Sequence, residues 1–237
     1  MRTTETVLQH IEAQLQDRSL TVGMRLPGER ALAEQLGVSR GSVREALQVL
    51  AAMGVVRRAV GSGADSGAVL IAEPLAPLSS ALRLHVATQA FPVSEVVETR
   101  VLLESWAVAG AARAGRPLDG LVALLDRMDD PSLDVRDFLR LDAQLHVAMA
   151  ELSGNALVGA IMASLRSSIE TYVQGSVPHV ADWPALLDTL RAEHRAVVAA
   201  IAAGDPALAS DRVSQHIRDF YVVSGLHLDD PPPDRAV

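Results

Sequence analysis

The sequence contains no cysteine, no lysine, few aromatic residues and no apolar run long enough to cross a membrane. Without cysteine, neither a disulfide framework nor a thiolate metal site can form. All 21 basic residues are arginine, which we attribute to genome base composition. The opening segment MRTTETVLQHIEAQL mixes charged with apolar residues as no signal peptide does. These absences predict a cytoplasmic protein with no membrane partner.

The chain's length and charge distribution predict two modest domains. Its 237 residues exceed one typical domain, and 49% hydrophobic content with little aromatic character suits helices rich in Ala, Leu and Val. Residues 1–70 hold eight Arg and seven Asp or Glu, whereas residues 71–237 hold 13 Arg and 22 acidic residues. An acidic body joined to a near-neutral head can still bind DNA if the arginines of the head share one face.

Residues 1–70 have the pattern of a winged helix-turn-helix. A first helix is predicted by an apolar stripe, and a short second helix is followed by a Gly37-Val38 turn. Ser39 is suited to cap a third helix, and VVRRAV and AVLIA predict two short strands around a Gly/Ser loop. Helix, tight turn and helix is the unit whose second helix enters the major groove. The apolar positions are Val7, Leu8, Ile11 and Leu15, then Leu32 and Leu36, then Val43, Leu47 and Leu50.

Three arginines of this unit are candidates for DNA contact. Arg40 and Arg44 are four residues apart at the start of the third helix, the end that meets base edges, and Arg30 begins the preceding helix, within reach of phosphate. Solvated helix arginines are the alternative. Their placement within a helix-turn-helix favours DNA contact.

Four residues are candidates for one metal site: Asp142, His146, His194 and His216. Asp142 and His146 are four apart on one helical pattern, so they share a face. His194 precedes the Gly204-Asp205-Pro206 turn by ten residues, and His216 follows it by ten, which places both roughly 15 Å from the turn.

Asp142 and His146 lie roughly 10–16 Å from the end of their own helix near Ser153. If those helix ends share one side of a bundle, all four groups sit at one depth. Each residue alone would more often be a surface carboxylate or a core histidine. Imidazole and carboxylate ligands together suit Zn²⁺ first and Ni²⁺ second. We assign structural roles to the other histidines, His10, His85, His179 and His227.

Longer stretches resemble a known family. RLPGERALAEQLGVSRGSVREAL resembles the signature of the GntR family of bacterial regulators, and RVLLESWAVAGAA, LDAQLHVAMAELSGN and AEHRAVVAAIAAGDPALA resemble helices of the FCD effector domain of FadR-type members. The resemblance implies a dimeric transcription factor with an all-helical antiparallel bundle, which holds a metal and a small carboxylate effector. The loop VGSGADSGAVL is longer than the family's usual wing turn. The DNA-binding residues that the resemblance implies are Arg30, Ser39, Arg40, Gly41, Ser42, Arg44 and Gly61.

Arg100 and the function itself each leave alternatives open. Arg100 forms either an i,i+4 pair with Glu104 or a guanidinium fork for an effector carboxylate.

A metal-dependent hydrolase is disfavoured as the function, because no general base lies at an obvious spacing from the metal candidates and a hydrolase has no need of the DNA-binding unit. A metal-independent regulator of a larger apolar effector, such as an acyl-CoA, has no use for the ligand set.

The sequence therefore predicts a mainly α protein. We expect a winged helix-turn-helix over residues 1–70, a linker over 71–76, an FCD bundle of seven helices over 77–227 and a disordered tail over 228–237. The predicted function is ligand-responsive control of transcription, as a repressor. A homodimer would bind a palindromic operator in double-stranded DNA and respond to a small organic acid.

Overall fold

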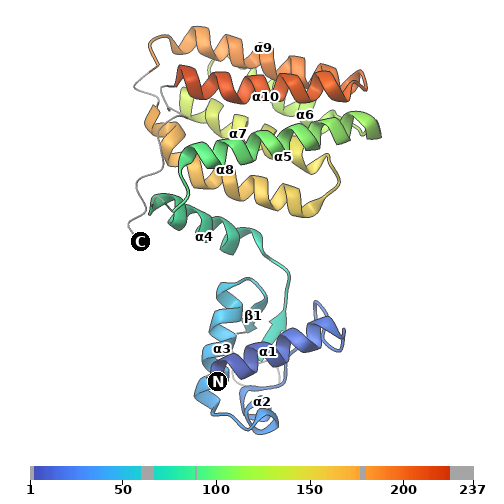
Figure 1. Cartoon of the computed structure of the whole chain (residues 1–237), viewed down its shortest axis with the longest axis vertical. Helices are drawn as coiled ribbons and strands as arrows, with labels where there is room; N and C mark the ends of the chain where they lie inside the picture. The colour runs from blue at the N-terminus through green and yellow to red at the C-terminus, as the bar shows by residue number, and fades with distance from the viewer. Residues whose placement is uncertain (1–2, 60–66, 89, 177–179, 225–237) are drawn as a thin grey trace. The chain divides into compact units, whose positions relative to one another are not determined.

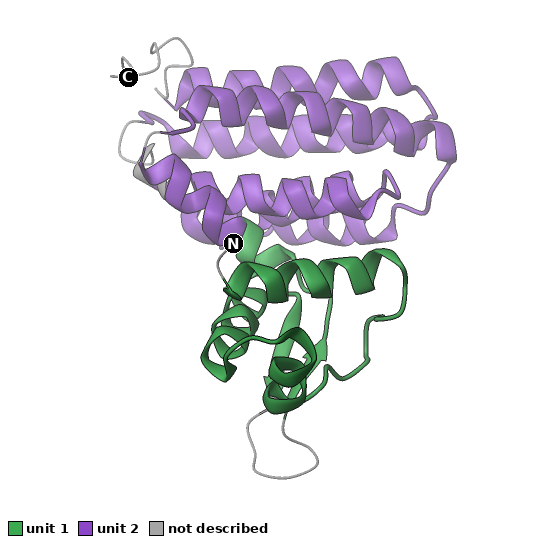
Figure 2. Ribbon diagram, turned by 60° about the horizontal axis from the view of Figure 1, so that its bottom comes forward, with its two compact units in different colours: residues 1–78 green, residues 79–237 purple. Residues whose placement is uncertain are grey.

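The computed structural model describes residues 3–59, 67–88, 90–176 and 180–224, and the mainly α fold is confirmed. The chain divides into two compact units, Met1–Leu78 and Ser79–Val237 (Figure 2). Unit 1 contains α1 (Thr3–Gln16), α2 (Glu29–Leu36), α3 (Arg40–Ala52), β1 (Val56–Ala59) and β2 (Gly67–Leu70). Helix α4 (Leu75–Ala87) crosses the boundary between the units. Unit 2 continues with α5 (Val93–Ala114), α6 (Asp119–Met128), α7 (Val135–Glu151), α8 (Ala156–Ser176), α9 (Trp183–Ala202) and α10 (Pro206–Val223) (Figure 1).

Unit 1 is a helix-turn-helix whose turn follows from local chemistry. Gly37 ends α2 in the left-handed conformation, with φ of 64°, which glycine adopts without steric cost. Ser39 caps α3, because its side chain accepts a hydrogen bond from the backbone N–H of Ser42 at 3.0 Å. Helix α1 packs on α3 through a core that includes most of the predicted apolar stripe. The buried predicted positions are Val7, Ile11, Leu32, Val43, Leu47 and Leu50.

The two predicted strands form an antiparallel pair. Val56 pairs with Leu70 and Ala59 with Gly67, so the strands are in register over their whole length. Ala68 and Leu70 point into the core of unit 1. The wing loop at residues 60–66, which contains Gly61, lies outside the described residues.

The expected linker is shorter than the sequence indicated, because Leu75 and Ala76 form the first turn of α4. Pro77 is the third residue of this helix. The first N–H groups of a helix have no intrahelical partner, so a proline there does not interrupt it. The expected tail over residues 228–237 lies outside the described residues.

Helix α5 is the central helix of unit 2 and packs against α7, α8, α9 and α10. Its small buried residues, such as Ala107 and Ala111, allow neighbouring helices to approach closely. The α9–α10 turn matches the expectation: Gly204 has φ of 68°, and the Asp205 side chain accepts from the N–H of Leu208 at 3.0 Å. Seven helices, α4 to α10, are present in the described residues from Leu75 to Val223, the number that the sequence predicted for residues 77–227. Among the described residues, no helix combines the length and apolar character needed to span a membrane.

Candidate functional site

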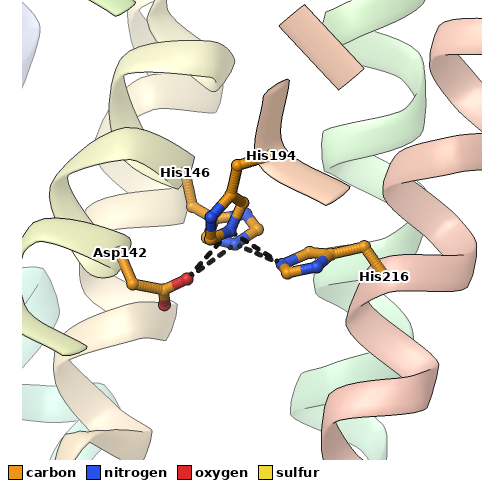
Figure 3. Close-up of side chains that lie close together, drawn as sticks. All are labelled: Asp142, His146, His194 and His216. Carbon is orange, nitrogen blue, oxygen red and sulfur yellow. Dashed lines mark hydrogen bonds and ion pairs between the residues drawn. The ribbon is translucent and has the colours of Figure 1, made fainter. Parts of the chain in front are cut away.

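Unit 2 brings together the four residues that helical spacing predicted to lie at one depth. Helix α7 carries Asp142 and His146, α9 carries His194 and α10 carries His216. All four are buried, and one ligand atom from each lies within 4.8 Å of the others. Figure 3 shows the three imidazoles and the carboxylate converging between these helices. Three helices that are separate in sequence thus contribute to one centre.

The separations between these atoms fit a single metal ion. Oδ1 of Asp142 lies 3.4 Å from Nε2 of His146 and 3.1 Å from Nε2 of His194. Nε2 of His216 lies 3.2 Å from Nε2 of His146 and 3.0 Å from Nε2 of His194. Ligands bound to zinc at 2.0–2.1 Å in a tetrahedron are about 3.3 Å apart, so these four separations match those of ligands that share one ion.

The outer ring nitrogens fix which atoms face the centre. Nδ1 of His146 contacts Oε2 of Glu104, and Nδ1 of His216 lies 2.7 Å from Oε2 of Glu193. Because a carboxylate accepts, each Nδ1 carries the proton and each Nε2 presents a lone pair inward. Two lone pairs 3.2 Å apart repel each other unless a cation lies between them. This donor arrangement fits a divalent metal.

Burial and the charges around the centre shift the pKa values of three of the four candidate ligands, two in the direction that favours metal binding and one against it. Burial opposes ionisation of Asp142, but Arg166 and His146 outweigh it and hold the pKa of that carboxyl well below its usual range. Burial, with a contribution from His216, lowers the pKa of His194 to about 3, so that ring stays neutral. Burial would lower the pKa of His146, but Glu104 and Asp142 outweigh it and the pKa is raised.

Sequence reasoning did not place three polar residues beside the centre, and it named Glu104 only as a partner for Arg100. Glu104 on α5 is fully buried and contacts His146, and Arg166 on α8 donates to Asp142. Glu193 accepts from His216, as described above. Only the proximity of Glu193 to His194 in the chain could have suggested that residue. Glu104 and Arg166 reach the site through packing of α5 and α8 against α7, which no local spacing reveals.

Arg100 is buried and engaged at both ends. Its Nε donates to Glu104 Oε1 at 3.0 Å, and its Nη1 donates to the Tyr221 hydroxyl at 2.9 Å. The i,i+4 pair considered from the sequence is therefore present. Arg100 also lines a cavity of about 10 Å³ beside Asp142, His146 and Arg166, so it lies next to the candidate centre. A space of that size holds about one water molecule.

A larger cavity of about 370 Å³ lies between α7 and α8. Its walls are mainly apolar and include Leu139, Val147 and Ile169. Arg166 lines both this groove and the small cavity beside the centre. That arginine therefore connects Asp142, a candidate metal ligand, with the surface groove.

The candidate DNA-contacting arginines of unit 1 are all exposed. Arg40 begins α3, and Arg44 lies one turn further, where it pairs with Glu29 at 2.9 Å. The side chain of Arg30 is 81% exposed and lies 3.9 Å from Glu34. These positions leave the guanidinium groups accessible to a nucleic acid.

The other candidate DNA-binding residues are placed differently. Ser39 caps α3, and Ser42 is buried, with its hydroxyl hydrogen-bonded to those of Thr3 and Ser39. Gly41 is exposed. Gly61 lies outside the described residues, as do His179 and His227, whereas His10 and His85 are not part of the metal cluster. DNA contact by the candidate set stays a prediction.

Comparisons with known proteins agree with this architecture. Residues 3–65 match the family model "Bacterial regulatory proteins, gntR family", and residues 95–219 match the "FCD domain". The putative L-lactate dehydrogenase operon regulatory protein of Escherichia coli (strain K12) is 30% identical over 91% of this chain and 84% of its own length. The HTH-type transcriptional regulator LutR of Bacillus subtilis (strain 168) is 30% identical over 89% of this chain and 96% of its own length. The solved structure of a Streptococcus agalactiae GntR has a TM-score of 0.62 and 25% identity, covering 94% of this chain and 100% of that chain.

Proposed function

Because the chain belongs to the gntR family of bacterial regulatory proteins and contains an FCD domain, we propose that it is a DNA-binding transcription regulator controlled by a metal-dependent effector site. Its relatives are regulators and not enzymes, so the hydrolase alternative is set aside. The observation that carries the effector part is the convergence of Asp142, His146, His194 and His216 on one point.

The residue types support a divalent metal, Zn²⁺ in the first place and Ni²⁺ in the second. Four protein ligands would hold the ion, and Glu104 and Glu193 would orient two of the imidazoles through their Nδ1 atoms. A bound divalent ion supplies Lewis-acid character and positive charge, which attract a carboxylate. The intact ligand set favours this proposal over a metal-independent regulator of an apolar effector.

We infer that the effector is a small organic acid, such as a hydroxy acid, a sugar acid or a dicarboxylate. Arg100 and Arg166 both line the small cavity, so either guanidinium can hold a carboxylate oxygen. The E. coli relative's name refers to an L-lactate dehydrogenase operon, and L-lactate is a hydroxy acid, which supports this class. At about 10 Å³ the cavity is too small for such an acid. Binding would therefore require this cavity to widen, and its walls include Phe220 and Tyr221 on α10, the helix that carries His216.

In unit 1 the recognition helix is α3, and the expected DNA target is a palindromic operator. Two half-sites about one helical turn apart require two related recognition helices, so the DNA-binding species is a homodimer. Repression follows if the dimer without effector binds the operator and effector binding alters the spacing of the two helices. Light scattering at micromolar concentration tests the dimer. A monomer that protects a palindrome would contradict it.

The metal-dependent effector site is tested by metal analysis and thermal shift. The purified protein should carry about one divalent ion per chain, and His146→Ala or His194→Ala should lose it. His85→Ala is the matched control, because His85 is exposed and outside the cluster. An effector acid should raise the melting temperature of metal-loaded protein and not of chelator-treated protein. Unchanged metal content in both cluster variants would refute the shared site.

A further inference from the structure

Glu29, the first residue of α2, lies among the exposed arginines of unit 1. Its Oε2 accepts from Arg44 Nη2 at 2.9 Å, and its Oε1 accepts from Arg58 Nη2 at 3.5 Å. Hydrogen bonding from Arg44 lowers the pKa of Glu29, and the charges of Arg58 and Arg40 add to the effect. One ionised carboxylate therefore links α2 to both the recognition helix and strand β1.

The contact between Glu29 and Arg44 uses only one edge of the guanidinium. Arg44 donates through Nε, 3.3 Å from Oε2, and through Nη2, 2.9 Å from the same oxygen. Within the described residues, Nη1 of Arg44 makes no hydrogen bond. The free donors are those of Nη1 and the second N–H of Nη2, and this end-on pair matches O6 and N7 of guanine.

We propose that Glu29 is a positioning residue that determines DNA specificity, because it holds Arg44 with this end-on pair presented to a guanine. The inference rests on the proposed role of α3 as the recognition helix. A free arginine loses side-chain entropy when it binds a base, and a guanidinium already held in place loses less. The same carboxylate repels DNA phosphates, so its effect on sequence-independent binding is opposite in sign.

This opposition gives an experimental signature. The probes are a duplex selected by the wild-type protein from random-sequence DNA and a scrambled duplex of equal length. For Glu29→Gln, affinity for the selected duplex should fall and affinity for the scrambled duplex should rise. The ratio of selected-duplex affinity to scrambled-duplex affinity should fall by about fivefold or more per half-site. A change of about fivefold is the lower end of the discrimination that one bidentate base contact provides.

Three further variants distinguish the positioning of Arg44 by Glu29 from the effect of the negative charge of Glu29. Glu34→Gln removes an equal charge from α2, but its carboxylate contacts the exposed Arg30 at 3.9 Å and not Arg44, so the ratio should be unchanged. Glu29→Asp keeps the charge but shortens the side chain, so the ratio should fall while scrambled-duplex affinity stays near wild type. In an Arg44→Ala background, Glu29→Gln should leave the ratio unchanged, because its effect acts through Arg44.

The outcomes are distinct. An unchanged ratio for Glu29→Gln overturns the positioning role, as does an equal fall in the Arg44→Ala background. A wild-type ratio for Arg44→Ala alone overturns the proposal, because Glu29 is argued to act through Arg44, whereas a wild-type ratio for the Arg40→Ala, Arg44→Ala double variant shows that the recognition-helix assignment has failed. Selection repeated with Glu29→Gln should relax preference at the same base pair as selection with Arg44→Ala. Relaxation elsewhere overturns the proposal even if the variant is less stable.

Discussion

Replacing Glu104 by glutamine should weaken metal binding and destabilise unit 2. The wild-type carboxylate is fully buried and accepts from two donors, Nε of Arg100 at 3.0 Å and Nδ1 of His146. Glutamine offers one acceptor oxygen and one donor NH₂ in the same volume, so it cannot accept from both. If the NH₂ faces His146, the ring must move its proton to Nε2, which removes that atom's lone pair from the metal site. If the NH₂ faces Arg100, a buried cation meets a donor.

The losses of metal affinity and of unfolding free energy can both be estimated from the contacts and burial of Glu104. Loss of an outer partner of a metal-binding histidine lowers metal affinity about 10- to 100-fold, which is about 1.4–2.7 kcal/mol. Arg100 and Glu104 have side-chain exposures of 2% and 0%, so solvent cannot replace the lost charge. Breaking a buried ion pair from one side costs about 3–5 kcal/mol of unfolding free energy. Metal-free Glu104→Gln should therefore unfold at clearly lower urea concentration than the metal-free wild type.

Competition with a coloured zinc chelator measures the affinity, and urea denaturation of chelator-treated protein measures the stability. Glu98→Gln is the matched control, because Glu98 lies on the same helix and is exposed. Glu193→Gln should have a smaller effect than Glu104→Gln, since Glu193 is 31% exposed and water can solvate its partner. If Glu104→Gln binds zinc as tightly as the wild type, the role assigned to the outer carboxylate is wrong.

Three other outcomes are expected. Arg40→Ala and Arg44→Ala should each cost about 1–3 kcal/mol of DNA-binding free energy per guanine contact, doubled over two half-sites. Full-strength operator binding by the double variant, measured by gel shift at fixed salt, would contradict the assignment of α3 as the recognition helix. Bound metal should decrease as pH falls, because the pKa of His146 is raised in the metal-free chain and protons compete for its Nε2 below that pKa; equilibrium dialysis across the histidine range would show this, and constant occupancy would argue against histidine ligation. Gly54→Ala should destabilise unit 1 by more than about 1–2 kcal/mol, the cost of the left-handed conformation, because its Cβ would also overlap the Glu73 carbonyl. Gly23→Ala, with φ of 92° and open space around it, should incur only the conformational cost in a denaturant melt.

The elements that the sequence predicted well are those with local causes. Gly37 and Ser39 determine the turn and cap of the helix-turn-helix, and Gly204, Asp205 and Pro206 determine the α9–α10 turn. Once helix ends are known, the fixed rise per residue places His194 and His216 at equal depth. Local chemistry, together with the assumption that the helix ends share one side of a bundle, was therefore enough to predict the composition of the candidate metal centre.

The polar surroundings of the centre depended on contacts between helices distant in sequence. Helix α5 has buried residues around much of its circumference, so periodicity does not reveal that Arg100 and Glu104 face the ligands. Arg166 resembles any helix arginine until α8 packs against α7. The hydroxyl of Ser42, a candidate for DNA contact, also hydrogen-bonds to that of Thr3, a contact between α1 and α3 that local spacing does not predict.

The spread of the ligands along the chain has a consequence for assembly. Asp142 and His216 enclose roughly 75 residues, so an ion bound to both acts as a reversible cross-link. By the loop-closure relation for disulfides, such a link would reduce the entropy of the unfolded chain by an amount equivalent to about 4–5 kcal/mol. During synthesis the set stays incomplete until α10 has been made. Metal binding would then be a late step that stabilises only chains in which α10 has docked correctly. A chain with α10 misplaced would lack the cross-link formed by the ion and would be more exposed to proteolysis.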